Sequence, residues 1–81
     1  MEIAFTPGAW RQWRKLPAAV QTRLKQKLIT YSRDPLRHAV KLSDLRIGQY
    51  RFRIGDYRII FDLANKTLYV LAVGHRSEIY R

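Results

Sequence analysis

The chain contains no cysteine, so neither disulfide bonds nor thiolate-bound metal can stabilise its fold. This absence fits a reducing compartment, and we expect a cytoplasmic protein. No apolar run approaches the ~18 residues that a membrane-spanning helix needs. The N-terminus also lacks the basic start and long apolar stretch of a signal peptide. We therefore expect no membrane association.

Acidic residues are also scarce. Six stand against sixteen lysines and arginines, which gives a net charge of +10 in 81 residues. The basic residues extend from Arg11 to Arg81, as on a charged folded surface rather than a basic tail. So basic a domain is expected to bind nucleic acid, an anionic membrane or an acidic protein. The two histidines lie far apart and no phosphate-binding glycine loop is present, so we expect any catalysis to need no metal and no cofactor.

Length and pattern predict one domain over residues 1–81. A weak alternation over residues 1–5 predicts a strand, and Thr6-Pro7 predicts a capped helix start. After a break at Pro17, an apolar stripe on residues 17–32 predicts a second helix. We expect Trp10 and Trp13 in the core. Residues 35–46 are predicted to form a loop with one possible helical turn, whose leucines Leu36, Leu42 and Leu45 tuck inward.

The segment from Gly48 to Phe61 is the most informative part of the chain. It alternates apolar residues with arginine around Gly55-Asp56, which predicts a hairpin with a type II′ turn. In that register Arg53 lies opposite Arg58, and one face carries only apolar and aromatic side chains. The opposite face carries Arg51, Arg53 and Arg58. Like charges facing each other destabilise a sheet. An anionic ligand would relieve the repulsion, and arginine is well suited to phosphate.

A further strand is predicted over residues 68–73, joined by a link at Asn65-Lys66 that sets Arg58 opposite Val73. The predicted fold is α+β. It consists of a small twisted antiparallel sheet, with one N-terminal strand plus a three-stranded meander, and two N-terminal helices packed on one face. The arginine face is expected to stay open, with Ile60, Leu71 and Val73 beside the arginines.

The third strand is expected to bring His75, Arg76 and Tyr80 to the open face. Fixed cations could stabilise the charge that builds up on a phosphodiester during cleavage. Histidine is the side chain best suited to proton transfer near neutral pH, so His75 is a candidate for that role, and Tyr80 could stack on a base or move a proton. A metal-free route to cutting RNA uses the 2′-hydroxyl of the substrate as nucleophile. The alternatives are solubilising arginines, a surface histidine and a tyrosine that only packs.

The hairpin and the end of the chain together resemble the RelE branch of the RelE/ParE toxin superfamily. The residues that carry the resemblance are Gly48-x-Tyr50-Arg51-x-Arg53-x-Gly55-Asp56-Tyr57-Arg58-Ile59-Ile60 and Val73-Gly74-His75-Arg76-x-Glu78-x-Tyr80. The resemblance covers nearly the whole chain. It implies a sheet-and-helix ribonuclease that enters the ribosomal A site, cleaves mRNA there and is neutralised by an acidic antitoxin.

The resemblance also implies residue roles. Arg58, Arg76 and Tyr80 would be catalytic, with Tyr80 as base or stacking platform, and Arg51 and Arg53 would bind substrate. From its place at the end of the third strand, we expect His75 to bind substrate as well. The stretch from Gly74 to Tyr80 is shorter than in some members, so Arg76 matches either of two family arginines. Two alternatives stay open. One is a ParE-like protein that inhibits DNA gyrase without being an enzyme. The other is a weakly active domain that only binds its antitoxin or RNA.

Overall fold

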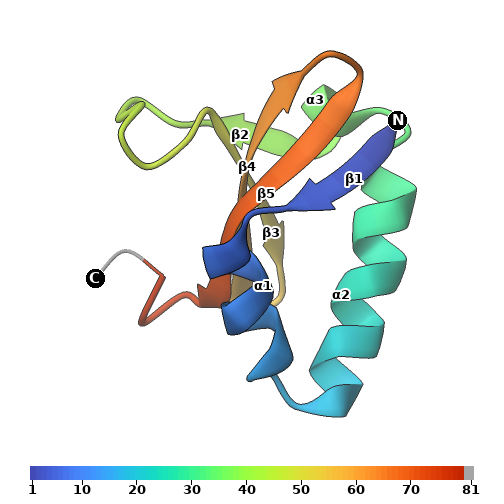
Figure 1. Cartoon of the computed structure of the whole chain (residues 1–81), viewed down its shortest axis with the longest axis vertical. Coiled ribbons are helices and arrows are strands. Elements are labelled where there is room, and N and C mark those ends of the chain that lie inside the picture. Colours follow the sequence, from blue (N-terminus) through green and yellow to red (C-terminus); the bar gives the residue numbers. More distant parts are fainter. Residues whose placement is uncertain (80–81) are drawn as a thin grey trace.

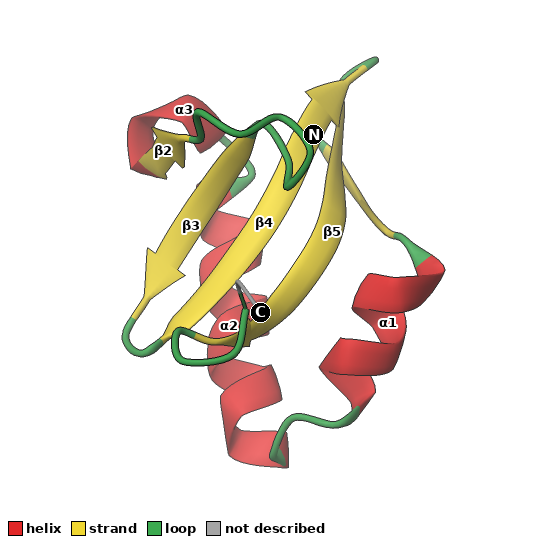
Figure 2. Cartoon of the chain, turned by 90° about the vertical axis from the view of Figure 1, so that its left-hand side faces the viewer, coloured by secondary structure: helices red, strands yellow, loops and turns green. Residues whose placement is uncertain are grey.

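The structure, a computed structural model, describes residues 1–79. The elements in chain order are β1 (Glu2–Phe5), α1 (Pro7–Arg14), α2 (Ala18–Tyr31), α3 (Pro35–His38), β2 (Ala39–Lys41), β3 (Tyr50–Ile54), β4 (Tyr57–Ala64) and β5 (Thr67–His75). The strands form one sheet in the order β1-β5-β4-β3-β2 (Figure 1). Seen from the sheet side, α2 lies behind the strands and α1 lies beside β5 (Figure 2). The predicted α+β class, the meander and the helix-covered face are confirmed.

The sheet differs from the prediction in two ways. It is mixed, because β1 pairs in parallel with β5, from Glu2 opposite Thr67 to Phe5 opposite Val70. It also has a fifth strand, because β2 pairs with β3 at the other edge. At three residues, β2 is too short to show an alternating pattern, which explains why no sequence signal predicted it.

The helices begin where the sequence indicates. The Thr6 hydroxyl accepts a hydrogen bond of 3.1 Å from the Ala9 amide, which satisfies one of the otherwise unpaired N–H groups of α1. The stripe of α2 buries Leu24 and Leu28 against the sheet. Trp13 is buried as predicted, but Trp10 is 49% exposed and the core assignment was wrong for it. The short helix α1 lies at the β5 side of the sheet (Figure 2), where Trp10 packs against Phe5 in a T-shaped arrangement with ring centroids 5.9 Å apart.

The loop between β2 and β3 covers part of the sheet face that was expected to be open. The predicted inward leucines are wrong for Leu36 and Leu45, which are 58% and 72% exposed. The loop is instead held by Gln49. Its backbone amide donates to Asp62 Oδ1 at 2.8 Å, and its side-chain Oε1 accepts from the backbone amide of Leu63 at 2.9 Å. As a result Ile60, on the arginine face, is only 1% exposed.

Glycine is required at position 48 in this loop. Its φ is +154°, and a Cβ atom there would lie 2.6 Å from Ile60 Cγ2 and 3.1 Å from Leu71 Cδ1. Forcing a methyl group into a packed site costs about 1–3 kcal/mol, and backbone strain adds to this. We expect Gly48→Ala to lower the free energy of unfolding by at least about 2 kcal/mol in urea denaturation. Gly8→Ala is the matched control, because its added Cβ would meet no atom closer than 3.9 Å. Equal stability of the two variants would contradict the argument.

Candidate functional site

The hairpin of β3 and β4 has the predicted register. Ile54 lies opposite Tyr57 and Arg53 opposite Arg58. Gly55 has a φ of +58° and Asp56 does not have a positive φ, which fits the predicted type II′ turn. Consecutive residues of a strand point to opposite faces of the sheet. Tyr57 therefore faces the helices, while Arg53 and Arg58 face outward.

Arg58 is buried rather than exposed as expected, because only 7% of its surface is accessible to solvent. Its Nη1 atom donates two hydrogen bonds of 2.9 Å, to the carbonyl oxygens of Gly55 and Tyr57. The chain after β5 folds back over this end of the sheet (Figure 2). Ile79 Cδ1 lies 3.5 Å from where a Cβ on Gly74 would be, and Gly74 is the β5 partner of Arg58. The positive charge of Arg58 is thus fixed at the base of the turn.

Arg76 is held at the same turn from the other side. Its backbone amide donates to the carbonyl of Asp56 at 2.7 Å, and its Nε lies 3.7 Å from Asp56 Oδ1. The side chains of Arg76 and Arg53 are exposed. We call Arg53, Arg58 and Arg76 the hairpin-tip arginine cluster. Arg53 and Arg58 pair across the hairpin, and Arg76 is bonded to Asp56 in its turn, so all three residues lie at this end of the sheet.

Two more arginines lie near the cluster. Arg51 is half-buried further along β3, opposite Ile60 and next to Val40 of β2. Arg23 of α2 reaches the turn itself, because a Cβ on Gly55 would lie 2.8 Å from its Nη2 atom. No sequence signal indicates the contact, because it depends on how α2 packs against the hairpin.

His75 does not join the arginines, and its predicted place on the open face is wrong. The β4–β5 pairing contains a bulge, since Phe61 pairs with Val70 but Ile60 pairs with Ala72. The extra residue, Leu71, shifts the rest of β5 by one position, and such a shift turns each side chain to the other face. Arg58 therefore faces Gly74 instead of Val73. Val73 is 2% exposed in the core, and His75 pairs with Tyr57.

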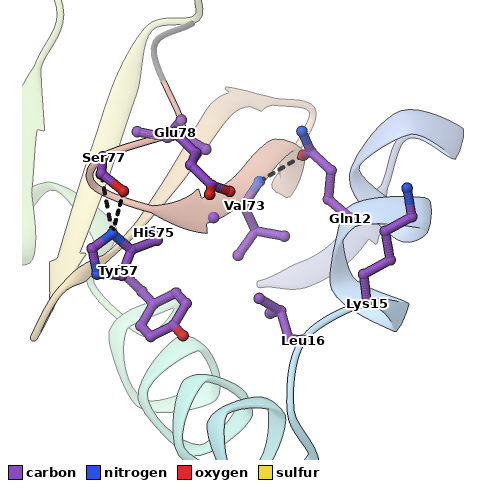
Figure 3. Close-up of a pocket in the computed structure, with 10 residues that line it drawn as sticks. Gln12, Lys15, Leu16, Tyr57, Val73, His75, Ser77 and Glu78 are labelled. Carbon is purple, nitrogen blue, oxygen red and sulfur yellow. Dashed lines mark hydrogen bonds between the residues drawn. The ribbon is translucent and has the colours of Figure 1, made fainter.

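His75 instead lines a pocket at the edge of β5. Because β1 pairs only as far as Val70, no strand lies beside Val73 on that edge of β5, and the Val73 amide donates to Gln12 Oε1 of α1 at 2.9 Å. The remaining space between α1 and the turn after β5 forms an open cavity of about 620 Å³, which we call the edge pocket (Figure 3). Its lining includes Gln12, Lys15, Leu16, Tyr57, His75 and Glu78.

The imidazole of His75 is fixed within this pocket. The Ser77 amide donates to His75 Nδ1 at 3.1 Å, and the Ser77 hydroxyl lies 2.8 Å from the same atom (Figure 3). In the neutral ring the proton therefore sits on Nε2. The rings of Tyr57 and His75 lie edge to face, with centroids 5.6 Å apart.

Comparison with known proteins identifies the family. The family profile described as "ParE toxin of type II toxin-antitoxin system, parDE" matches residues 3–80. This chain belongs to that toxin family. Within it, the chain is 31% identical to the mRNA interferase toxin RelE of Escherichia coli K12, covering 96% of this chain and 87% of the relative. It is 33% identical to the toxin RelG of Mycobacterium tuberculosis, covering 98% and 94%.

Solved structures agree with the RelE branch predicted from the resemblance. The toxin is similar to a chain of the RelBE2 toxin–antitoxin complex of M. tuberculosis, with a TM-score of 0.82 and 29% identity over 93% of this chain and 96% of that chain. It is also similar to the isolated E. coli RelE toxin, with a TM-score of 0.77 and 29% identity over 98% and 89%. The family profile bears the ParE name, but these relatives and structures bear RelE or RelG names.

Some predictions for this toxin lie beyond what the structure describes. Tyr80, predicted as base or stacking platform, lies outside the described residues 1–79.

Within those residues, no group of three histidine or acidic side chains could hold a metal ion. No helix among them is long and apolar enough to span a membrane.

Proposed function

We propose that this toxin is an endoribonuclease that cleaves mRNA at the ribosome. The observation that carries the proposal is the hairpin-tip arginine cluster, a buried and hydrogen-bonded Arg58 with Arg53 opposite it and Arg76 on the same turn. Preorganised positive charge in a fixed position is the main requirement for stabilising a phosphodiester transition state. Relatives named mRNA interferase, covering 96% of this chain, support the choice of substrate.

The proposed reaction uses the 2′-hydroxyl of the RNA as nucleophile. Its oxygen bonds to phosphorus and loses a proton to a base, while the bond from phosphorus to the 5′-oxygen breaks and that oxygen takes up a proton. The products are a 2′,3′-cyclic phosphate and a 5′-hydroxyl end. Arg58 and Arg76 stabilise the charge on the phosphoryl oxygens, and Arg51 and Arg53 bind the flanking backbone. Tyr80 keeps the role that the family resemblance implies, base or stacking platform.

The partner in this proposal is an acidic antitoxin. Similar structures include RelB–RelE complexes of E. coli and of M. tuberculosis, in which the toxin is bound to its antitoxin. A net charge of +10 favours a partner of opposite sign. We expect the dissociation constant of toxin and antitoxin, measured by titration calorimetry, to rise with salt because screening weakens contacts between exposed charges. A constant that does not change with salt would mean that the contact is mainly apolar.

A cleavage assay tests the function directly. The purified toxin is added to programmed ribosomes and, separately, to the same mRNA alone, and the new 5′ ends are mapped. We expect cuts only on the ribosome. A deoxynucleotide on the 5′ side of the mapped cut should abolish cleavage there, because it lacks the attacking oxygen. The ParE name of the family profile favours gyrase inhibition as a second candidate. Inhibited gyrase together with intact mRNA would overturn the proposal in favour of that function.

A further inference from the structure

The edge pocket and the hairpin-tip arginine cluster are built from adjacent residues of the same two strand ends. On β4, Tyr57 lines the pocket and the next residue, Arg58, belongs to the cluster. After the turn, His75 lines the pocket and the next residue, Arg76, belongs to the cluster. Neighbouring residues of a strand lie only about 3.3 Å apart along its axis. Their side chains point to opposite faces, so an RNA strand that passes around this end of the sheet can place a phosphate on one face and the adjoining base on the other.

The lining of the edge pocket suits a base better than a phosphate, because the opposite charges of Lys15 and Glu78 leave it without net positive charge. Two partly exposed aromatic rings, Tyr57 and His75, and the apolar side chain of Leu16 offer surfaces for an unstacked base. The Glu78 carboxylate, which points into the cavity in Figure 3, repels an anion but accepts hydrogen bonds from base amino groups. Gln12 is oriented by the bond from Val73, so its amide nitrogen can donate to a base acceptor.

The volume agrees with this assignment. A cavity of about 620 Å³ lies within the usual range for small-molecule sites and is ample for a base with its ribose. Two of its lining residues, His75 and Ser77, flank Arg76 in the sequence, so an RNA strand that leaves the pocket past these residues reaches the cluster.

We propose that the edge pocket binds a nucleobase of the RNA, one that carries an amino group, next to the phosphate held by the hairpin-tip arginine cluster. The proposal rests on the proposed function for its substrate class. It assigns His75 to base binding rather than to phosphate binding. Glu78, which sequence reasoning did not select, becomes the residue that distinguishes bases.

Uncharged nucleosides test the pocket separately from the charge of the protein. Adenosine, guanosine, cytidine and uridine are titrated into the purified toxin while the ring signals of Tyr57 and His75 are followed by NMR. We expect the three nucleosides with amino groups to shift both rings, and uridine to bind about fivefold more weakly. Inorganic phosphate should instead shift the guanidinium signals of Arg53 and Arg58.

Two variants with the same change in charge complete the test. Glu78→Gln should weaken nucleoside binding about fivefold, because a hydrogen bond to a charged acceptor is stronger than one to an amide. Glu2→Gln, at the start of β1 and outside the pocket lining, should leave it unchanged. Ring signals that respond to no nucleoside, or equal effects of both variants, would overturn the proposal. Nucleoside binding without any mRNA cleavage would support the pocket and count against the proposed function. Cleavage of mRNA without any response of the rings to nucleosides would support the proposed function and overturn the base-binding pocket.

Discussion

Arg58→Ala should reduce the rate of mRNA cleavage about 100-fold or more and abolish growth arrest on expression. The size follows from other enzymes, where losing one preorganised group that stabilises transition-state charge costs about 10²–10³ in rate. Arg58 is preorganised in this sense, because it is 7% exposed and bound to two carbonyl oxygens of its own hairpin. Single-turnover cleavage of mRNA on programmed ribosomes is the measurement.

Three further variants separate chemistry from folding. Arg37→Ala removes the same charge from the exposed face of α3 and should cleave at the normal rate. Arg58→Lys keeps the charge but loses the planar fork, so we expect partial activity. Arg53→Ala removes the exposed partner opposite Arg58 and should lower cleavage while leaving thermal stability equal or slightly higher, because like charges no longer face each other. Normal cleavage by a folded Arg58→Ala protein would refute the proposed role.

The hairpin could be predicted from the sequence because every signal for it comes from residues within the hairpin itself. Gly55 sets the turn, and the alternation from Tyr50 to Phe61 sets which side chains face the helices. The second link, Asn65-Lys66, was also predictable, and both residues have the positive φ of a type I′ turn. These local sequence signals were therefore enough to predict the meander and the pairing of Arg53 with Arg58.

The misplacement of Val73 and His75 has one physical cause, the bulge in β5. Counting residues from Asn65-Lys66 gives Arg58 opposite Val73, whereas the extra residue Leu71 puts Gly74 there. A bulge has no required residue type, so alternation alone did not reveal it. One hint was present, because a regular register turns apolar Val73 out of the core. The burial of Arg58 and the contact of Arg23 with Gly55 depend on distant segments, and no pattern within either strand encodes them.

Phe52→Ala should give the largest loss of stability of any change considered, about 3–5 kcal/mol. Phe52 is fully buried, stacks on Phe61 with ring centroids 4.2 Å apart and meets the edge of Tyr31 at 5.2 Å. An 81-residue domain has a total unfolding free energy of roughly 4–12 kcal/mol. The loss is therefore comparable with the whole stability of the protein. Urea denaturation followed by the fluorescence of buried Trp13 measures it.

Val40→Ala is the matched control, because Val40 lies on the adjacent strand β2 but is 49% exposed, and its loss should be below about 1 kcal/mol. A cost for Phe52→Ala below about 1.5 kcal/mol would show that the aromatic stack is not what stabilises the sheet. The burial of Phe52 also matters for the hairpin-tip arginine cluster. Phe52 precedes Arg53 and pairs with Ile59, the residue after Arg58, so the buried stack maintains the register that sets the two arginines against each other. A repulsive pair of this kind persists only where the opposite face of the same strands is packed tightly enough to outweigh it.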